Sequence, residues 1–271
     1  MIREANRLGL RVGGHIPAFS TPDAMVEAGY DEISHLNQLV FGWISGPGDD
    51  TRTLFRLTGL KRLADFDLAS APVRRTLDLI ARHKVAIDAT PTVLENIHLR
   101  RDGQIPPGAA GYLNHMPVAA RREMMRGLAD ISAPGDDEAY RRAFDKQMEL
   151  GRLLHTRGVL VLPGTDVGGP FAYHRALELM QRFGMKPSEI LRRATLDMAE
   201  YTGQSARLGS IEAGKLADFF LVPGDPTKDL KAISSVKLVA KDGIFYYPAE
   251  VYPKFGIKPF AAPPNIASSK P

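Results

Sequence analysis

The stretch VLVLPGTDVGG, residues 159–169, decides the fold class of this chain. It is a short apolar run that stops at Pro-Gly-Thr-Asp and two glycines, which is typical of a buried strand ending in a turn. A helical pattern precedes the run, and two more helical patterns follow it. Asp166 therefore lies where a buried strand ends, at a position that serves either a turn or chemistry.

Three further segments predict short buried strands of the same kind: residues 11–16, 31–36 and 84–90. A helix predicted over 20–29 separates the first two strands, with Ser20 or Thr21 as its cap and Gly29 at its end. Helices that alternate with strands in this way predict an α/β fold with a parallel sheet.

Long connections follow the strands, whereas the turns from helix to strand are short. Residues 37–71 follow the second strand, and residues 91–137 follow the third. In a parallel α/β barrel, function gathers in the loops at the C-terminal ends of the strands. Four side chains that could take part in chemistry lie at these ends: His15, His35, Thr90 and Asp166.

His15 and His35 end consecutive strands. Because adjacent strand ends lie about 5 Å apart, two imidazoles there can converge on one divalent cation. Asp166 can join them, since a carboxylate at such a site both ligates the metal and accepts a proton from water. The alternative for each residue is structural: a histidine satisfied in the core, or a turn residue.

Other polar residues are weaker candidates. His174 opens the helix after Asp166 and, like Thr90, is expected to contact substrate. His98 is expected in a long loop within reach of substrate, and Asp88 is expected to be a buried, hydrogen-bonded acid. Phosphate-binding loops, dinucleotide fingerprints and serine nucleophile elbows are missing from the sequence.

The segments after residue 206 lose the alternation of helix and strand. Residues 208–224 and 235–248 each predict a strand–turn–strand pattern, and the second turns at Asp242-Gly243. The Pro-rich C-terminus is expected to be extended or frayed. The expected domains are a barrel segment over 1–206, β-sandwich strands over 207–250 and a tail over 251–271.

Composition is that of an ordinary globular protein. The 271 residues are 44% hydrophobic, and the net charge is +4 with lysines and arginines scattered among acids. No apolar run approaches the roughly 20 residues of a membrane helix. The absence of cysteine excludes disulfides and thiolate metal sites. We expect neither nucleic acid nor a membrane as a partner.

Two stretches resemble the metal-dependent amidohydrolases. GHIPAFSTPDAMVEAGYDEISHL, residues 14–36, resembles their fifth and sixth strands, each ending in a metal-binding histidine. VLPGTDVGG and the sequence up to LGSIEAGKLADFFLVPGDP resemble the eighth strand and the return to a small composite β-sandwich. The resemblance covers residues 1 to about 250 and favours the imidazolonepropionase- and prolidase-like branch. It implies a partial TIM-like (β/α) barrel, equivalent to strands five to eight, followed by a small β-sandwich subdomain.

The resemblance also implies roles. His15 and His35 resemble ligands of one metal, and Asp166 resembles the residue that binds the other metal and shuttles the proton. The implied cofactor is a divalent metal, zinc in the first place, with one or two ions in the complete enzyme. The implied reaction is attack of metal-bound hydroxide on the carbonyl of an amide, a peptide or a cyclic amide.

The sequence departs from the family pattern in one large respect. It contains no H-x-H motif, which the family carries on its first strand, and no equivalent of its fourth-strand Lys or Glu. We therefore expect the C-terminal half of a longer enzyme, inactive alone. The alternatives are a non-catalytic or partner-dependent half-barrel, completed by the missing half or by self-association, and a mononuclear enzyme using only His15, His35 and Asp166.

Overall fold

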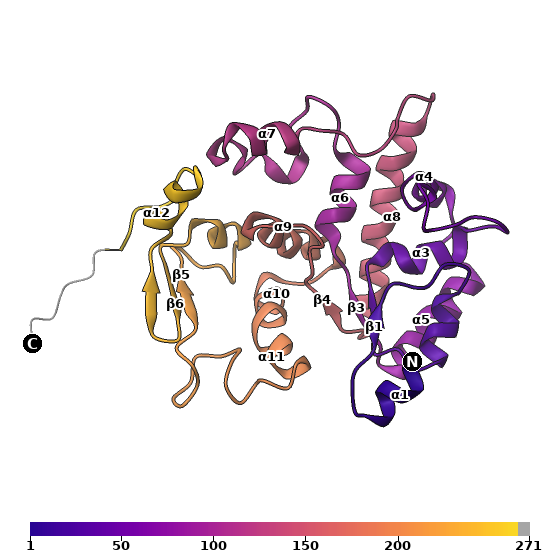
Figure 1. The fold of residues 1–271 in the computed structure, drawn as a ribbon, viewed down its shortest axis with the longest axis horizontal. Coiled ribbons are helices and arrows are strands. Elements are labelled where there is room, and N and C mark those ends of the chain that lie inside the picture. The colour runs from indigo at the N-terminus through magenta and orange to yellow at the C-terminus, as the bar shows by residue number, and fades with distance from the viewer. Residues whose placement is uncertain (265–271) are drawn as a thin grey trace, which may run out of the picture. The chain divides into compact units, whose positions relative to one another are not determined.

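The computed structural model describes residues 1–264, and the chain forms two compact units (Figure 1). The first unit comprises residues 1–107 and 125–185, and the second comprises residues 108–124 and 186–271. Each unit has its own sheet, and they are described separately below.

The first unit is built on a four-stranded parallel sheet in the order β1-β2-β3-β4. The strands are β1 (Gly13–Gly14), β2 (Glu32–Ser34), β3 (Ala86–Asp88) and β4 (Val161–Leu162). Ile87 pairs with Ile33 on one side and with Val161 on the other. The predicted parallel α/β fold is confirmed, although each strand is shorter than its apolar pattern.

Helices connect each strand to the next, as the alternation in the sequence predicts. The first unit contains α1 (Ile2–Arg7), α2 (Pro22–Glu27), α3 (Leu36–Ile44), α4 (Phe55–Thr58), a 3₁₀ helix (Gly59–Asp65), α5 (Ala71–His83), α6 (Pro91–Leu99), α8 (Asp136–Thr156), α9 (Pro170–Met180) and a 3₁₀ turn (Gln181–Phe183). Thr21 caps α2, because its hydroxyl oxygen accepts from the backbone N–H of Ala24 at 3.2 Å.

The core of the first unit lies between the sheet and its helices. Ile33, Ile87 and Val161 are fully buried, as are Leu77 and Ile80 on the inner face of α5. Each aliphatic side chain removed from water contributes about 1.5–3 kcal/mol, so this layer holds the strands in register. Helix α6 packs along α8, the longest helix in the described chain (Figure 1).

The second unit carries a three-stranded antiparallel sheet in the order β5-β6-β7. Its elements are α7 (Val118–Met124), α10 (Pro187–Arg192), a π-helical turn (Arg193–Asp197), α11 (Met198–Tyr201), β5 (Phe219–Leu221), a 3₁₀ helix (Leu230–Ser235), β6 (Leu238–Lys241), β7 (Ile244–Tyr246), α12 (Pro248–Val251) and a 3₁₀ turn (Tyr252–Phe255). The hairpin predicted at Asp242-Gly243 is confirmed, and both residues have positive φ as its turn requires.

Three predictions for the second unit are wrong in detail. Residues 208–224 hold one strand, β5, because Gly209 and Gly214 turn the chain and Leu216 donates to Arg207 O at 3.0 Å. The helix predicted over 187–203 contains a π-helical turn, where the Thr195 hydroxyl bonds Leu191 O at 2.7 Å.

The tail predicted to be extended from residue 251 instead begins with the end of α12 and a 3₁₀ turn that stops at Gly256. Residues 265–271 of that predicted tail lie outside the described residues. Across residues 1–264, no helix combines the length and the apolarity needed to cross a membrane.

Candidate active site

Three side chains meet at the C-terminal ends of the parallel strands. His35 Nε2 lies 2.8 Å from His15 Nε2 and 3.8 Å from Asp166 Oδ2. The two imidazole rings meet edge to face, with centroids 4.7 Å apart. The structure thus brings together the three residues that the sequence selected from strands far apart along the chain.

The His35 ring is buried and its orientation is held from behind. Its Nδ1 lies 2.9 Å from Thr90 Oγ1, which is also buried. With the proton on Nδ1, Thr90 accepts the hydrogen bond and the Nε2 lone pair points at His15 and Asp166. Burial lowers the pKa of His35, opposed by the Asp166 charge and assisted by the charges of His15 and Arg56. The lowered pKa favours the neutral ring, which is the form that binds metals.

Backbone strain is concentrated at the same place. His35, Thr90 and Asp166 have φ values of 70°, 40° and 52°, in the left-handed region that side chains other than glycine rarely adopt. Such conformations cost of order 1–3 kcal/mol each and cluster at functional sites. Here they turn each side chain back over the end of its strand.

Asp88 lies beneath this cluster, at the end of β3. Burial, and to a smaller extent the negative charge of Glu32, raise the pKa of the Asp88 carboxyl to about 6. Hydrogen bonds from the backbone N–H groups of Gly164 and Thr90 oppose this rise. A Cβ at Gly164 would collide with the Asp88 carboxylate, so glycine there lets β4 approach β3 closely.

Gln38 is a site residue that sequence reasoning missed. Its backbone N–H donates to His35 O at 3.0 Å, and its side-chain Oε1 accepts from Ile16 N at 3.0 Å. The residue therefore ties the strand end that carries His35 to the one that carries His15. The signal in the sequence is a polar Asn-Gln pair, residues 37–38, inside an otherwise apolar segment that follows His35.

His174 lies inside the helix after Asp166 rather than at its start, and His98 lies on a helix rather than in a loop. His174 lies on α9, where burial lowers its pKa to about 4 and its Nδ1 has no hydrogen-bond partner in the described chain. Its predicted contact with substrate, like that of Thr90, stays a prediction. His98 was expected in a loop but lies fully buried on α6, with Nδ1 2.7 Å from Leu94 O.

The donor chemistry of the cluster suits a divalent cation. Zinc–nitrogen distances of about 2.0–2.1 Å place two tetrahedral nitrogen ligands about 3.3 Å apart, so the two Nε2 atoms, 2.8 Å apart, would separate by about 0.5 Å to hold one ion. Asp166 adds an oxygen donor, and Thr90 supports His35 as the hydrogen bonds behind metal-bound histidines do. Within residues 1–264, however, no group of three or more His, Asp or Glu side chains is arranged to hold a metal ion.

Comparison with known proteins identifies the class. The model of the amidohydrolase family matches residues 69–245, and the chain belongs to this family. Members of the family are generally metal-dependent. No curated protein matches the chain.

Solved structures share the fold at low sequence identity. A Xaa-Pro dipeptidase with bound methionine is 20% identical with a TM-score of 0.55, over 91% of this chain and 47% of that one. A bottromycin amidohydrolase is 20% identical with a TM-score of 0.58, over 95% and 56%. The ochratoxinase of A. niger is 17% identical with a TM-score of 0.56, over 91% and 44%. The chain thus spans about half the length of these structures.

Proposed function

We propose that the chain is the C-terminal part of a metal-dependent amidohydrolase that hydrolyses a C–N bond in an amide, a peptide or a cyclic amide. The observation that carries the proposal is the meeting of His15, His35 and Asp166 at the strand ends of a parallel sheet. Membership of the amidohydrolase family supports the reaction class, and the similarity to a Xaa-Pro dipeptidase and a bottromycin amidohydrolase supports amide and peptide substrates.

The four parallel strands then correspond to strands five to eight of a (β/α) barrel, and the antiparallel sheet to part of a small β-sandwich. Strands that neighbour one another in chain order, as β1 to β4 do, are the arrangement of such a barrel. The proposed parts are residues 1–206 for the barrel segment and 207–250 for the sandwich strands.

Each residue of the cluster has a role in this proposal. His15 and His35 would hold the cation through Nε2, and Thr90 would keep the His35 ring in the tautomer that ligates. A divalent cation supplies a Lewis acid and an acidified water at such a site. Asp166 would ligate, accept the proton of the attacking water and return it to the leaving nitrogen, for which its half-exposed carboxylate is suitably placed.

The ligand set of this half is incomplete for catalysis. The sequence contains no H-x-H motif, and no complete metal-binding group is present within residues 1–264. We propose that the chain alone turns over substrate feebly or not at all, and that residues from the other half of the barrel complete the site. The open sheet, with β1 and β4 at its edges in the described chain, favours the second candidate, a half-barrel that acts only with a partner.

Metal content tests the proposal directly. The purified chain is dialysed against zinc and then against metal-free buffer, and bound zinc is measured by mass spectrometry. We expect His35→Ala to lose the zinc that the parent chain retains, and His83→Ala, at the exposed end of α5, to keep it. Equal zinc in the parent chain and in His35→Ala would refute the site.

An activity assay separates the alternatives. The zinc-loaded chain is incubated with N-acyl amino acids and Xaa-Pro dipeptides, and released amine is measured. Turnover that disappears in His35→Ala would show that the three residues suffice as a mononuclear site. Absence of turnover in a chain that retains zinc through His35 is the result we expect.

A further inference from the structure

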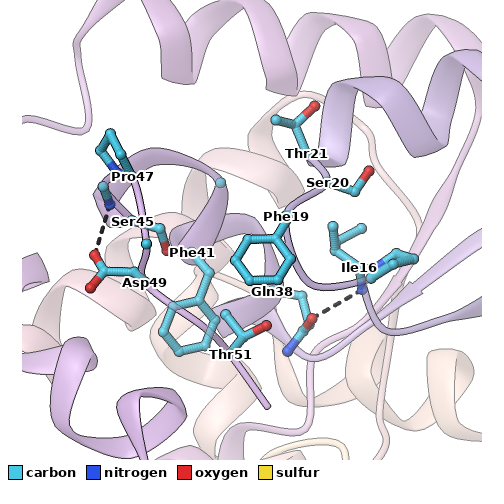
Figure 2. Close-up of a pocket in the computed structure, with 14 residues that line it drawn as sticks. Ile16, Phe19, Ser20, Thr21, Gln38, Phe41, Ser45, Pro47, Asp49 and Thr51 are labelled. Atoms are coloured by element: carbon cyan, nitrogen blue, oxygen red, sulfur yellow. Dashed lines mark hydrogen bonds between the residues drawn. The ribbon is translucent and has the colours of Figure 1, made fainter. Parts of the chain in front are cut away.

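A pocket of about 270 Å³ is lined by residues close in the sequence to His15 and His35, and Figure 2 shows its lining side chains. Its walls come from the loop after β1, from α3 and from the loop over residues 45–51. Ile16, which lines the pocket, directly follows His15, so their Cα atoms are about 3.8 Å apart. Gln38, three residues after His35, lines the same pocket. The pocket therefore begins within one residue of the cluster of His15, His35 and Asp166.

A hydrogen-bond donor in this pocket has no protein partner. Gln38 is only 7% exposed, and its amide orientation is settled because Ile16 N–H can bond only to the oxygen. The other end of the amide is therefore an NH₂ group, which makes no hydrogen bond within residues 1–264. Figure 2 shows this amide among the lining side chains, with its oxygen bonded to Ile16. This donor faces the open pocket rather than the protein interior, so an acceptor brought by a ligand can take the place of water there.

An aromatic ring is held at the same pocket under strain. Phe19 has a φ of 64° and is 71% exposed, with the Arg52 guanidinium 5.3 Å above its ring. A bulky residue in left-handed backbone is an outlier, and an exposed ring gives no burial energy in return. Phe41, which is buried, lines the pocket as well. Phe19, covered on one face by Arg52, and Phe41, packed on its other side against the core, therefore supply the aromatic part of the lining.

The pocket has no free charge to offer. Asp49 is the charged residue among those that line it, and its carboxylate already accepts from Gly46 N at 2.8 Å and from Arg62 at 2.6 Å. The remaining polar groups are hydroxyls, those of Ser20, Thr21, Ser45 and Thr51. This lining favours an uncharged ligand over an anion or a cation.

We propose that this pocket binds an uncharged planar ring bearing a carbonyl group, with the ring against Phe19 and Phe41 and the carbonyl oxygen accepting from Gln38 Nε2. Drug-sized sites begin at about 300 Å³, so a pocket of 270 Å³ suits a single ring rather than a longer ligand. If the chain hydrolyses amides, as proposed above, this pocket selects amides with a ring on one side of the scissile bond. That assignment to substrate rests on the proposed function, whereas the binding itself does not.

The binding is tested with benzamide, titrated into the isotope-labelled full chain and followed by NMR chemical shifts. We expect saturable shifts of the Ile16 and Gln38 amides. Benzylamine, which is cationic and has no carbonyl, and benzoate, which is anionic, are expected to bind at least about fivefold more weakly. Gln38→Glu keeps an oxygen for Ile16 N–H but removes the donor, and we expect about tenfold weaker binding of benzamide.

Phe19→Ala removes the exposed ring without touching the core and is expected to weaken benzamide binding about fivefold. Phe255→Ala, a ring 68% exposed in the second unit, is the matched control and should leave binding unchanged. Because Phe19 is on the surface, this variant keeps the proposal testable if Gln38→Glu does not fold.

Benzamide affinity that is unaffected by Phe19→Ala, or shifts that spread over the surface without saturation, would overturn the pocket assignment. Failure of the proposed function has a different signature, namely zinc content that does not depend on His35. If benzamide binding depends on Phe19 but zinc content does not depend on His35, the pocket assignment stands and the proposed function is refuted.

Discussion

Thr90→Val is the sharpest test of how the cluster is organised. Thr90 Oγ1 lies 2.9 Å from His35 Nδ1, and Thr90 is only 1% exposed. Valine has nearly the same shape as threonine but cannot accept the hydrogen bond. The variant therefore leaves a buried N–H unpaired and frees the His35 ring to rotate.

The expected loss follows from those two facts. An unpaired buried donor costs about 1–3 kcal/mol of folding stability. Loss of a hydrogen bond behind a metal-binding histidine lowers metal affinity about 10–100-fold, or about 1.4–2.8 kcal/mol. We expect Thr90→Val to lose both folding stability and zinc affinity. Its loss of zinc affinity should exceed that of a variant that is equally destabilised but keeps the hydrogen bond to His35.

Thr92→Val is the matched control. Thr92 is a buried threonine two residues further along, and its hydroxyl donates to Ala172 O at 2.9 Å, away from His35. Both variants are compared by urea unfolding and by competition for zinc with a chromophoric chelator. The reasoning is supported if the two variants are equally destabilised and only Thr90→Val loses zinc affinity. Zinc affinity that is the same in the two variants refutes it.

Three further predictions concern the first unit. Burial lowers the pKa of His98 to about 4, below the usual value of about 6.5, so the unfolded chain binds the extra proton between these values. Protonation of His98 should lower stability by up to about 3 kcal/mol as the pH drops from 6.5 to 4, and urea titrations at several pH values should show His98→Phe reducing this dependence. Part of it should remain, because the pKa of His174 is also lowered to about 4. Glu95→Ala should destabilise by about 1.5–3 kcal/mol, because Arg175 would lose its two bonds to Glu95, at 2.6 Å and 2.9 Å, but keep Glu178 at 2.8 Å; a loss below 1 kcal/mol would contradict this. Gly151→Ala should lower the melting temperature by overpacking α8, since its Cβ would collide with the Phe183 ring, at a cost of about 1–3 kcal/mol measured by calorimetry.

The candidate site shows where sequence reasoning succeeds and where it stops. His15, His35 and Asp166 were selected because each follows an apolar strand pattern, and parallel strands end at one edge of a sheet. That these three side chains lie close together could be predicted from this rule alone. Thr90 was selected on the same ground, but its hydrogen bond to His35 links positions 55 residues apart and leaves no local pattern.

The errors in the second unit have a similar origin. The sequence over 208–224 alternates as strands do, yet only Phe219–Leu221 finds a partner, on β6. Strand formation depends on the neighbour that accepts the backbone hydrogen bonds, and the positive φ of Gly209 and Gly214 turns the preceding residues away from one. The Asp242-Gly243 hairpin was predictable because both of its strands and its turn lie within a few residues.

The sequence by itself determined the features that local chemistry controls: the alternation of helix and strand, a helix cap at Ser20 or Thr21, the hairpin turn and the strand ends that carry His15, His35 and Asp166. The tertiary structure alone decided which groups face one another. It placed Gln38 between two strand ends with a free donor, buried His98 among the helices and held Phe19 in left-handed backbone. The physical reason is that capping and turn geometry act within a few residues, whereas burial and hydrogen-bond partners depend on segments brought together only by folding.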